Sequence, residues 1–375
     1  MRMPLAILPL FLASGLIAFA ADSGKNVFDA VWRDSDDAPA LSSDPKVWDF
    51  GFRPYGAGAD RLVSDPRVIR AAAEGGDTGG DRPTALSVSF NERGLDVFVA
   101  CFGPPLEEAL AATNAAPLPR LEFFIAPGDA DSSRIEPYWM MVFRRHPPVE
   151  EFPALEYDRD YRPLAPYVTA STVTRRNAVI VKLHYAWEGL FDRLPFLTCD
   201  KRDVFWRLSM IRWDLPGGGR TWGGQVHRPD EAGYIRFPRL TEEQENAIMS
   251  QVLVRAWESF TEESVRYELR ADGDVMSPQV DASARVREEL RRCPRTYVNY
   301  GEDPAMRPAL ERLVAERKAL GPAIARFREL PRTERAAFYR RACDMLFNFR
   351  LDVERTHAAI LAEKLDGIAG KEAGR

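Results

Sequence analysis

The chain of 375 residues is poor in the residues from which zinc sites are built. It has four histidines, scattered along the sequence, and four cysteines with no C-x-x-C pair, so no zinc-ligand spacing occurs. The cysteines are Cys101, Cys199, Cys293 and Cys343. Four cysteines allow three pairings, and free buried thiols remain equally open in a chain this long.

The common catalytic motifs are also absent. The sequence contains no G-x-S-x-G, H-E-x-x-H, Walker or G-x-G-x-x-G pattern. The glycines at 217–219 precede Arg-Thr-Trp and not a Lys-Ser/Thr pair, so they do not form a phosphate cradle. Carboxylate pairs such as Glu150 and Glu151 act as glycosidase groups only at a defined separation, which sequence does not reveal. We therefore expect a binding protein and not an enzyme.

Charge and hydropathy limit the partners further. A net charge of -5 disfavours nucleic acids and anionic membranes as partners. The one long apolar run, residues 4–19, follows Arg2 and ends in Ala18-Phe19-Ala20, the pattern of a secretory signal peptide. It is short for a membrane span, which needs roughly 20 residues. We expect residues 1–20 to be removed and the bacterial protein to be secreted or periplasmic, with no membrane span.

Residues 21–240 show short segments in which apolar and polar side chains alternate, separated by Pro and Gly turns. The segments are Thr84–Phe90, Leu95–Phe102, Arg120–Ala126, Tyr138–Phe143, Tyr167–Val173, Ala178–Tyr185, Val204–Arg212 and Tyr234–Phe237, with an earlier one near Val47–Phe50. Alternation with period two is typical of half-buried strands, and many short strands indicate a sandwich. The fold class predicted is mainly β, an antiparallel β-sandwich.

Residues 241–375 have a different texture, with apolar residues at steps of three and four. The expected helices are Glu242–Phe260, Ala305–Leu320 and Arg332–Ile368, the last ended by Gly367 and Gly370. Thr241, followed by acidic residues and Gln244, is typical of a helix N-cap. We predict an α-helical C-terminal region that either stabilises the sandwich or docks a protein partner.

The segment Val204–Pro238 carries the clearest functional pattern. Its loop GGGRTWGG contains Trp222, and the glycines could hold the indole outward as a platform for the apolar face of a sugar. The hydrogen-bond donors expected around this platform are Arg212, Arg220, Gln225 and His227. Arg207 and Arg212 are an odd number of positions apart and so face opposite sides of a regular strand. We assign Arg212 to the binding face, with a buried ion pair to an acid such as Glu122 as the alternative.

In order and spacing, this segment resembles the family 9 carbohydrate-binding modules and their DOMON-like relatives. The matching residues are Trp206, Arg207, Arg212, Trp222, His227, Arg228, Pro229, Gly233 and Phe237, and the resemblance extends over roughly residues 47–240. It implies a β-sandwich, a sugar held between two tryptophans, and calcium supporting the fold. Trp139, Trp187 and Trp213 are candidates for the second tryptophan, and Asp129 and Asp131 are weak calcium candidates.

These observations predict a secreted, non-catalytic protein that binds a carbohydrate or glycoconjugate. One alternative is a haem b-binding electron-transfer sandwich, which related folds suggest and for which this chain offers Met140, Met141, Met210, His184 and Lys182. We do not expect haem, because strand methionines are usually core residues. The other alternative is a structural surface-assembly protein whose helical region makes the contacts.

Overall fold

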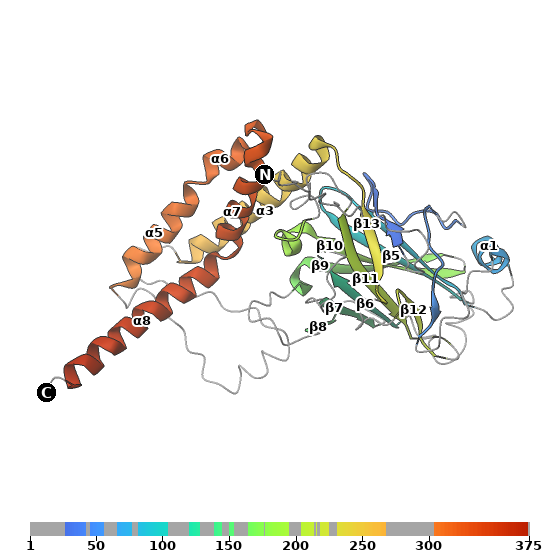
Figure 1. Ribbon diagram of the computed structural model, residues 1–375, viewed down its shortest axis with the longest axis horizontal. Coiled ribbons are helices and arrows are strands. Elements are labelled where there is room, and N and C mark those ends of the chain that lie inside the picture. The colour runs from blue at the N-terminus through green and yellow to red at the C-terminus, as the bar shows by residue number, and fades with distance from the viewer. Residues whose placement is uncertain are drawn as a thin grey trace, which may run out of the picture.

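The computed structural model describes most of the chain after the expected signal peptide. The described residues are 27–42, 46–55, 66–76, 82–103, 120–127, 139–144, 150–153, 164–175, 177–194, 204–213, 215, 218–224, 231–267 and 304–373. They form two β-sheets packed face to face, with a group of helices at one end of the sandwich (Figure 1). The predicted mainly-β sandwich with a helical C-terminal region is confirmed.

The first sheet, called sheet A here, is built around the central strand β11 (Val204–Arg212), which pairs with three other strands. Its strands run in the order β1 (Val27–Asp29), β13 (Gly233–Phe237), β11, β6 (Arg120–Ala126), β7 (Trp139–Arg144) and β8 (Glu150–Pro153). β12 (Arg220–Trp222) also pairs with β11, and β3 (Arg53–Pro54) pairs with β12. The long strands β6 and β11 begin and end where the alternation pattern predicts.

The second sheet, sheet B, is a simpler path. Its order is β2 (Val31–Trp32), β4 (Thr84–Phe90), β5 (Gly94–Phe102), β10 (Ala178–Ala186) and β9 (Val168–Arg175). The hairpin β4–β5 was expected, and the side chain of Asn91 closes its turn by accepting hydrogen bonds from the N–H groups of Arg93 and Gly94.

One feature departs from the antiparallel expectation. β1 pairs with β13, and β2 pairs with β4, both in parallel, so the N-terminal segment crosses from sheet A to sheet B at Ala30. The segment near Val47–Phe50 forms only an isolated bridge, Asp49 to Leu86, and no strand. Sequence patterns did not reveal β1, β2, β3, β8, β12 or the helix α1 (Pro66–Glu74), because such short elements carry too few alternations.

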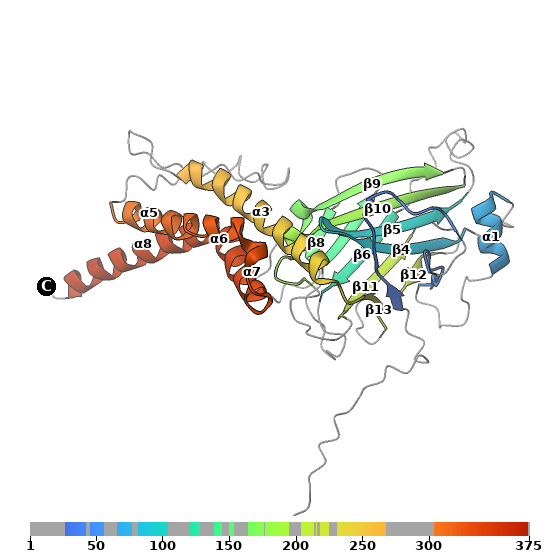
Figure 2. The same cartoon turned by 90° about the horizontal axis from the view of Figure 1, so that it is seen from above.

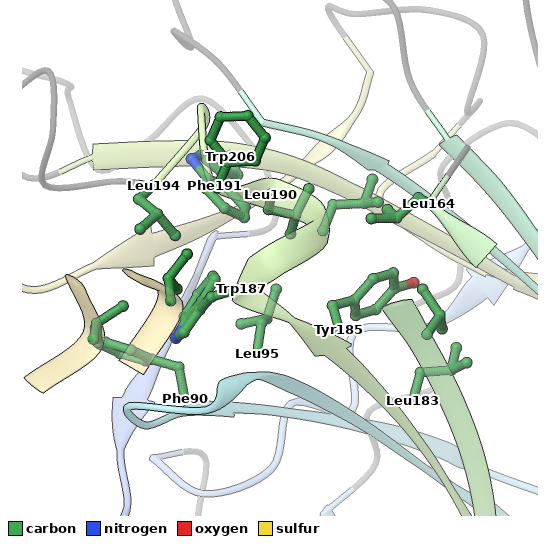
Figure 3. Close-up of a cluster of buried hydrophobic side chains, with 14 of the residues drawn as sticks. Phe90, Leu95, Leu164, Leu183, Tyr185, Trp187, Leu190, Phe191, Leu194 and Trp206 are labelled. Atoms are coloured by element: carbon green, nitrogen blue, oxygen red, sulfur yellow. The ribbon is translucent and has the colours of Figure 1, made fainter. Parts of the chain in front are cut away.

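The space between the sheets is filled by the inward-facing residues of the long strands. On β11 these are Trp206, Leu208 and Met210, all at most 1% exposed. A turn of 3-10 helix, η2 (Trp187–Leu190), closes one end of this core (Figure 3). Its Trp187 is fully buried and lies edge-on to Trp206, with ring centroids 6.2 Å apart. Trp206 is therefore a core residue of the sandwich.

The helical region comprises α3 (Glu242–Tyr267), α5 (Met306–Lys318), α6 (Gly321–Ala325), η4 (Phe327–Glu329), α7 (Arg332–Phe347) and α8 (Phe349–Ala373). The predicted N-cap is confirmed: Thr241 Oγ1 accepts from the N–H of Gln244, whose Oε1 accepts from the N–H of Thr241. The single helix expected over 332–368 is broken at Asn348, and α8 runs past Gly367 and Gly370. The prediction that these glycines end the helix is therefore wrong.

The helices and the sandwich share one hydrophobic core. One buried cluster continues from the sandwich residues into α3, α5, α7 and α8. At the junction the ring of Phe191 stacks on that of Phe347, with centroids 5.0 Å apart, and the hydroxyl of Tyr339 donates to the carbonyl of Phe191. The C-terminal half of α8 extends away from the sandwich (Figure 2). Among the described helices, none combines the length and the apolar character needed to cross a membrane.

Candidate functional site

Trp222 does not form an exposed platform. Its side chain is 0% exposed and faces the inter-sheet core, and its indole N–H donates to Asp49 Oδ2 over 2.7 Å. The glycines around it serve the turn and the packing: Gly223 and Gly224 have positive φ, and a Cβ on Gly233 would lie 2.4 Å from the Trp222 ring. The expectation of an outward indole is wrong. The glycines allow the backbone to pass close to the Trp222 ring, and this close approach buries the indole.

Arg212 is likewise internal. It is 3% exposed, and its guanidinium donates to the carbonyls of Pro83 and Phe102 and to Thr84 Oγ1, all on the sheet B side. Arg207 faces the other side of β11, as the odd spacing predicts. The assignment of Arg212 to an open binding face is wrong, because residues of even number on β11 point into the sandwich.

The other predicted site residues lie in several places. Arg220 is partly exposed and pairs with Arg212 and Pro54 in the ladder. Trp187 is part of the core, so it offers no second clamp. Trp139 lies on β7 opposite Ile125, but its side chain is outside the described residues. Gln225, His227, Asp129 and Asp131 also fall outside them.

An aromatic pair does reach the surface, on the outer face of sheet A. Trp213, directly after β11, and Tyr55, directly after β3, are both partly exposed, and their rings meet edge to face with centroids 5.3 Å apart. The N–H of Tyr55 donates to the carbonyl of Gly219, and a Cβ on Gly219 would lie 2.9 Å from the Trp213 ring. The glycine-rich loop therefore supports Trp213 and not an exposed Trp222.

Charged groups flank this pair on the same face. The backbone N–H of Trp213 donates to the backbone carbonyl of Arg120. The exposed guanidinium of Arg120 forms an ion pair with Glu122 at 3.0 Å. Glu122 is 7% exposed and lies on the outer face of sheet A, not inside the sandwich as the alternative for Arg212 supposed. Arg53 lies two residues before Tyr55. We call Arg53, Tyr55, Arg120, Glu122 and Trp213 the rim site.

The chemistry of the rim site suits a ligand with an apolar face and polar edges. The aromatic rings rest on the buried side chains of Phe124, Ala126 and Ile211, which hold them in place. A guanidinium already held by a carboxylate loses little freedom when it donates to a further acceptor. The indole N–H of Trp213 is enclosed and has no acceptor among the described residues. The sequence analysis named Trp213 as one of three candidates for the second tryptophan, and no sequence pattern indicated Tyr55.

A second polar group, the Asp96 cluster, lies on the outer face of sheet B. Asp96 is 1% exposed, and its Oδ1 lies 2.7 Å from His184 Nδ1 and 3.1 Å from Lys182 Nζ. Lys182 also donates to the backbone carbonyl of Asp36. The carboxylate of Asp36 accepts a hydrogen bond from the side chain of Asn91 and forms an ion pair with Arg93. Burial raises the pKa of Asp36, but the hydrogen bond from Asn91 and the charges of Lys182 and Arg93 outweigh it, so the pKa is lowered.

The described residues do not bring the proposed haem ligands together. Met210 points into the core from sheet A, whereas His184 and Lys182 lie on the outer face of sheet B and bind Asp96. Sheet B therefore stands between the two sets. The side chains of Met140 and Met141 are outside the described residues. Within the described part of the chain, no three His, Cys, Asp or Glu side chains converge as a metal site.

No family model and no curated protein sequence matches the chain. Among solved structures, it is similar to a family 9 carbohydrate-binding module from Caldicellulosiruptor kristjanssonii in complex with glucose, with a TM-score of 0.35, 10% identity, and coverage of 58% of this chain and 98% of the module. The same module in complex with cellotriose gives a TM-score of 0.35 at 10% identity, covering 58% of this chain and 96% of the module.

A third similar structure comes from Bacteroides uniformis, a protein whose assignment to carbohydrate binding is itself provisional. It has a TM-score of 0.32 and 8% identity, and the match covers 57% of this chain and 100% of that protein. Identities of 8–10% with these TM-scores transfer neither a ligand nor a site residue to this chain. The similarity to these structures concerns the fold alone.

Proposed function

We propose that the chain is an exported, non-catalytic protein that binds a carbohydrate or glycoconjugate at the rim site. The observation that carries the proposal is the partly exposed Tyr55–Trp213 pair beside the Arg120–Glu122 ion pair. A sugar presents an apolar C–H face, which an aromatic ring accepts, and hydroxyls that arginine and carboxylate groups read together.

Two features support the rim site over the sites predicted from sequence. The indole N–H of Trp222 donates to Asp49, and the guanidinium of Arg212 donates to Thr84 and to backbone carbonyls inside the sandwich. Trp213 is partly exposed, and its neighbour Arg120 has half of its side-chain surface exposed (52%). A ligand could therefore contact both groups without opening the core.

The test is titration calorimetry of the full chain against a panel of soluble oligosaccharides. We expect at least one ligand to bind, and Trp213→Ala to weaken it about tenfold or more, because stacking contributes on the order of 1 kcal/mol beyond buried area. Arg120→Ala is expected to weaken the same ligand. Trp32→Ala is the matched control, since Trp32 is also partly exposed but belongs to sheet B.

Circular dichroism of each variant checks that it has folded. No binding by the wild-type chain to any member of a broad panel would contradict carbohydrate binding. Binding that survives unchanged in folded Trp213→Ala and Arg120→Ala would place the ligand elsewhere on the molecule.

A further inference from the structure

The edges of the two sheets are protected unequally. An open edge offers unpaired N–H and C=O groups to another chain, and proteins usually blunt it with short strands, charges or proline. Three edges of sheet A do so: β1 has three residues including Asp29, β3 is Arg53–Pro54, and β8 reads Glu-Glu-Phe-Pro. At one edge of sheet B, β2 has only two residues.

β9, the other edge of sheet B, lacks these devices along all but its last position. It runs for eight residues, VTASTVTR, with no proline or glycine and a single charge at its last position. The side chains of Thr169, Ser171, Thr172 and Thr174 are exposed. Among the strands that the structure describes, only β10 pairs with β9, so within the described part of the chain the other side of its backbone has no strand partner (Figure 2).

We propose that β9 is a self-association edge, at which two copies of the chain pair antiparallel and join their B sheets into one. The composition favours a second copy because β9 is complementary to itself. A two-fold axis through Ser171 keeps the inner faces of both sheets on the same side, as a continuous sheet requires. It pairs Val168 with Thr174, Thr169 with Val173, Ala170 with Thr172, and Ser171 with its own copy.

This register places no like charges opposite each other. Arg175 faces Tyr167 of the second copy, so the arginines lie outside the ladder. The pairs inside it join β-branched and small residues, which are favourable cross-strand partners. A single ladder buries less surface than a standard interface, so we expect a weak, concentration-dependent dimer. The dimer would present two rim sites, one on each copy.

The test uses the full chain with Ser171→Cys. Directly opposed strand residues have Cα atoms about 4.5–5.5 Å apart, within disulfide reach. We expect mild oxidation to give a covalent dimer on a non-reducing gel, at a level above that of the wild-type chain, whose own cysteines set the background. Thr174→Cys is the matched control, because its two copies would lie roughly 20 Å apart in this register.

Sedimentation equilibrium gives a second readout. The wild-type chain is expected to pass from monomer to dimer as concentration rises, and Ser171→Lys, which opposes two like charges on the axis, is expected to remain monomeric. A wild-type chain that stays monomeric, with no more cross-linking in Ser171→Cys than in Thr174→Cys, would overturn the proposal. So would a dimer that Ser171→Lys leaves intact, because its contact must lie elsewhere.

Discussion

The outer faces of the two sheets use similar residue types in opposite ways. On sheet B, Trp48 is fully buried and donates to the carbonyl of Ala40, while Asp96 is enclosed with His184 and Lys182. On sheet A, the aromatic pair Tyr55–Trp213 keeps part of its surface open. Aromatic and charged residues therefore secure the chain's own N-terminal segment on one face and remain available on the other.

The difference shows that residue type alone does not identify a binding face. What separates the two faces is how far their groups are enclosed: Trp48 and Asp96 are at most 1% exposed, whereas the side chain of Arg120 is 52% exposed. The Trp48 indole and the Asp96 carboxylate are engaged by backbone or by neighbouring side chains. On this comparison, substitutions on the sheet B face should lower stability, and those at the rim site should mainly lower affinity.

Truncation of Trp48 is expected to have the largest effect. Trp48 packs with Phe50, Phe98 and Phe102 in a cluster on the outer face of sheet B, so Trp48→Ala should leave a large cavity. We expect a loss of about 3–5 kcal/mol in the free energy of unfolding, measured by urea titration. Trp213→Ala, whose ring is already partly in solvent, should cost clearly less. Equal losses at the two positions would contradict the contrast between the faces.

Removal of the Asp96 carboxylate should have the next largest effect. Asp96→Ala leaves Lys182 without its ion pair in a site where both are largely enclosed (15% and 1% exposed). Breaking a buried pair typically costs about 3–5 kcal/mol, and we expect the lower end because Lys182 keeps the carbonyl of Asp36.

Glu122→Ala on sheet A is the matched comparison for Asp96→Ala. Its partner Arg120 is 52% exposed, so water can replace the carboxylate, and we expect a loss below about 1 kcal/mol. Urea unfolding of both variants at neutral pH measures the difference. A loss for Glu122→Ala that matches that of Asp96→Ala would show that exposure of the partner does not decide the cost.

Sequence patterns were sufficient for the long strands and for the direction of alternation along them. β4, β6 and β11 have the expected bounds, because seven to nine residues carry several alternations and burial enforces each one. The odd spacing of Arg207 and Arg212 correctly predicted opposite faces. It could not predict which face packs on the other sheet, since that depends on contacts distant in sequence, such as Arg212 with Pro83 and Thr84.

The site was harder to predict for the same reason. The loop GGGRTWGG permits both an outward and an enclosed indole, and the choice is made by Asp49, 173 positions before Trp222. Tyr55 joins the rim site only because β3, a strand of two residues, pairs with β12. Contacts of this kind leave no local periodicity, so sequence patterns could not predict where the aromatic and charged side chains of the rim site come together.

The smallest expected effect concerns pH and the segment that covers sheet B. Because the lowered pKa of Asp36 belongs to the folded state, the folded chain holds this carboxylate ionised more firmly than the unfolded chain does. Its contribution to stability is therefore complete above the ordinary aspartate pKa of 3.8 and is lost as the pH falls through the lower, folded value. Asp36→Asn should be less stable than the wild type at pH 7, and the two should converge in acid.

Urea unfolding of both proteins at a series of pH values from neutral downward measures this convergence. The difference should be modest, because the Asp36 side chain is 35% exposed and Arg93 is 47% exposed, so solvent screens their attraction. Glu92→Gln, in the same hairpin turn, serves as the charge-matched control. If the gap between Asp36→Asn and the wild type were unchanged in acid, the carboxylate would not be the group that holds this segment on sheet B, and the contrast between the two faces would rest on Trp48 and Asp96 alone.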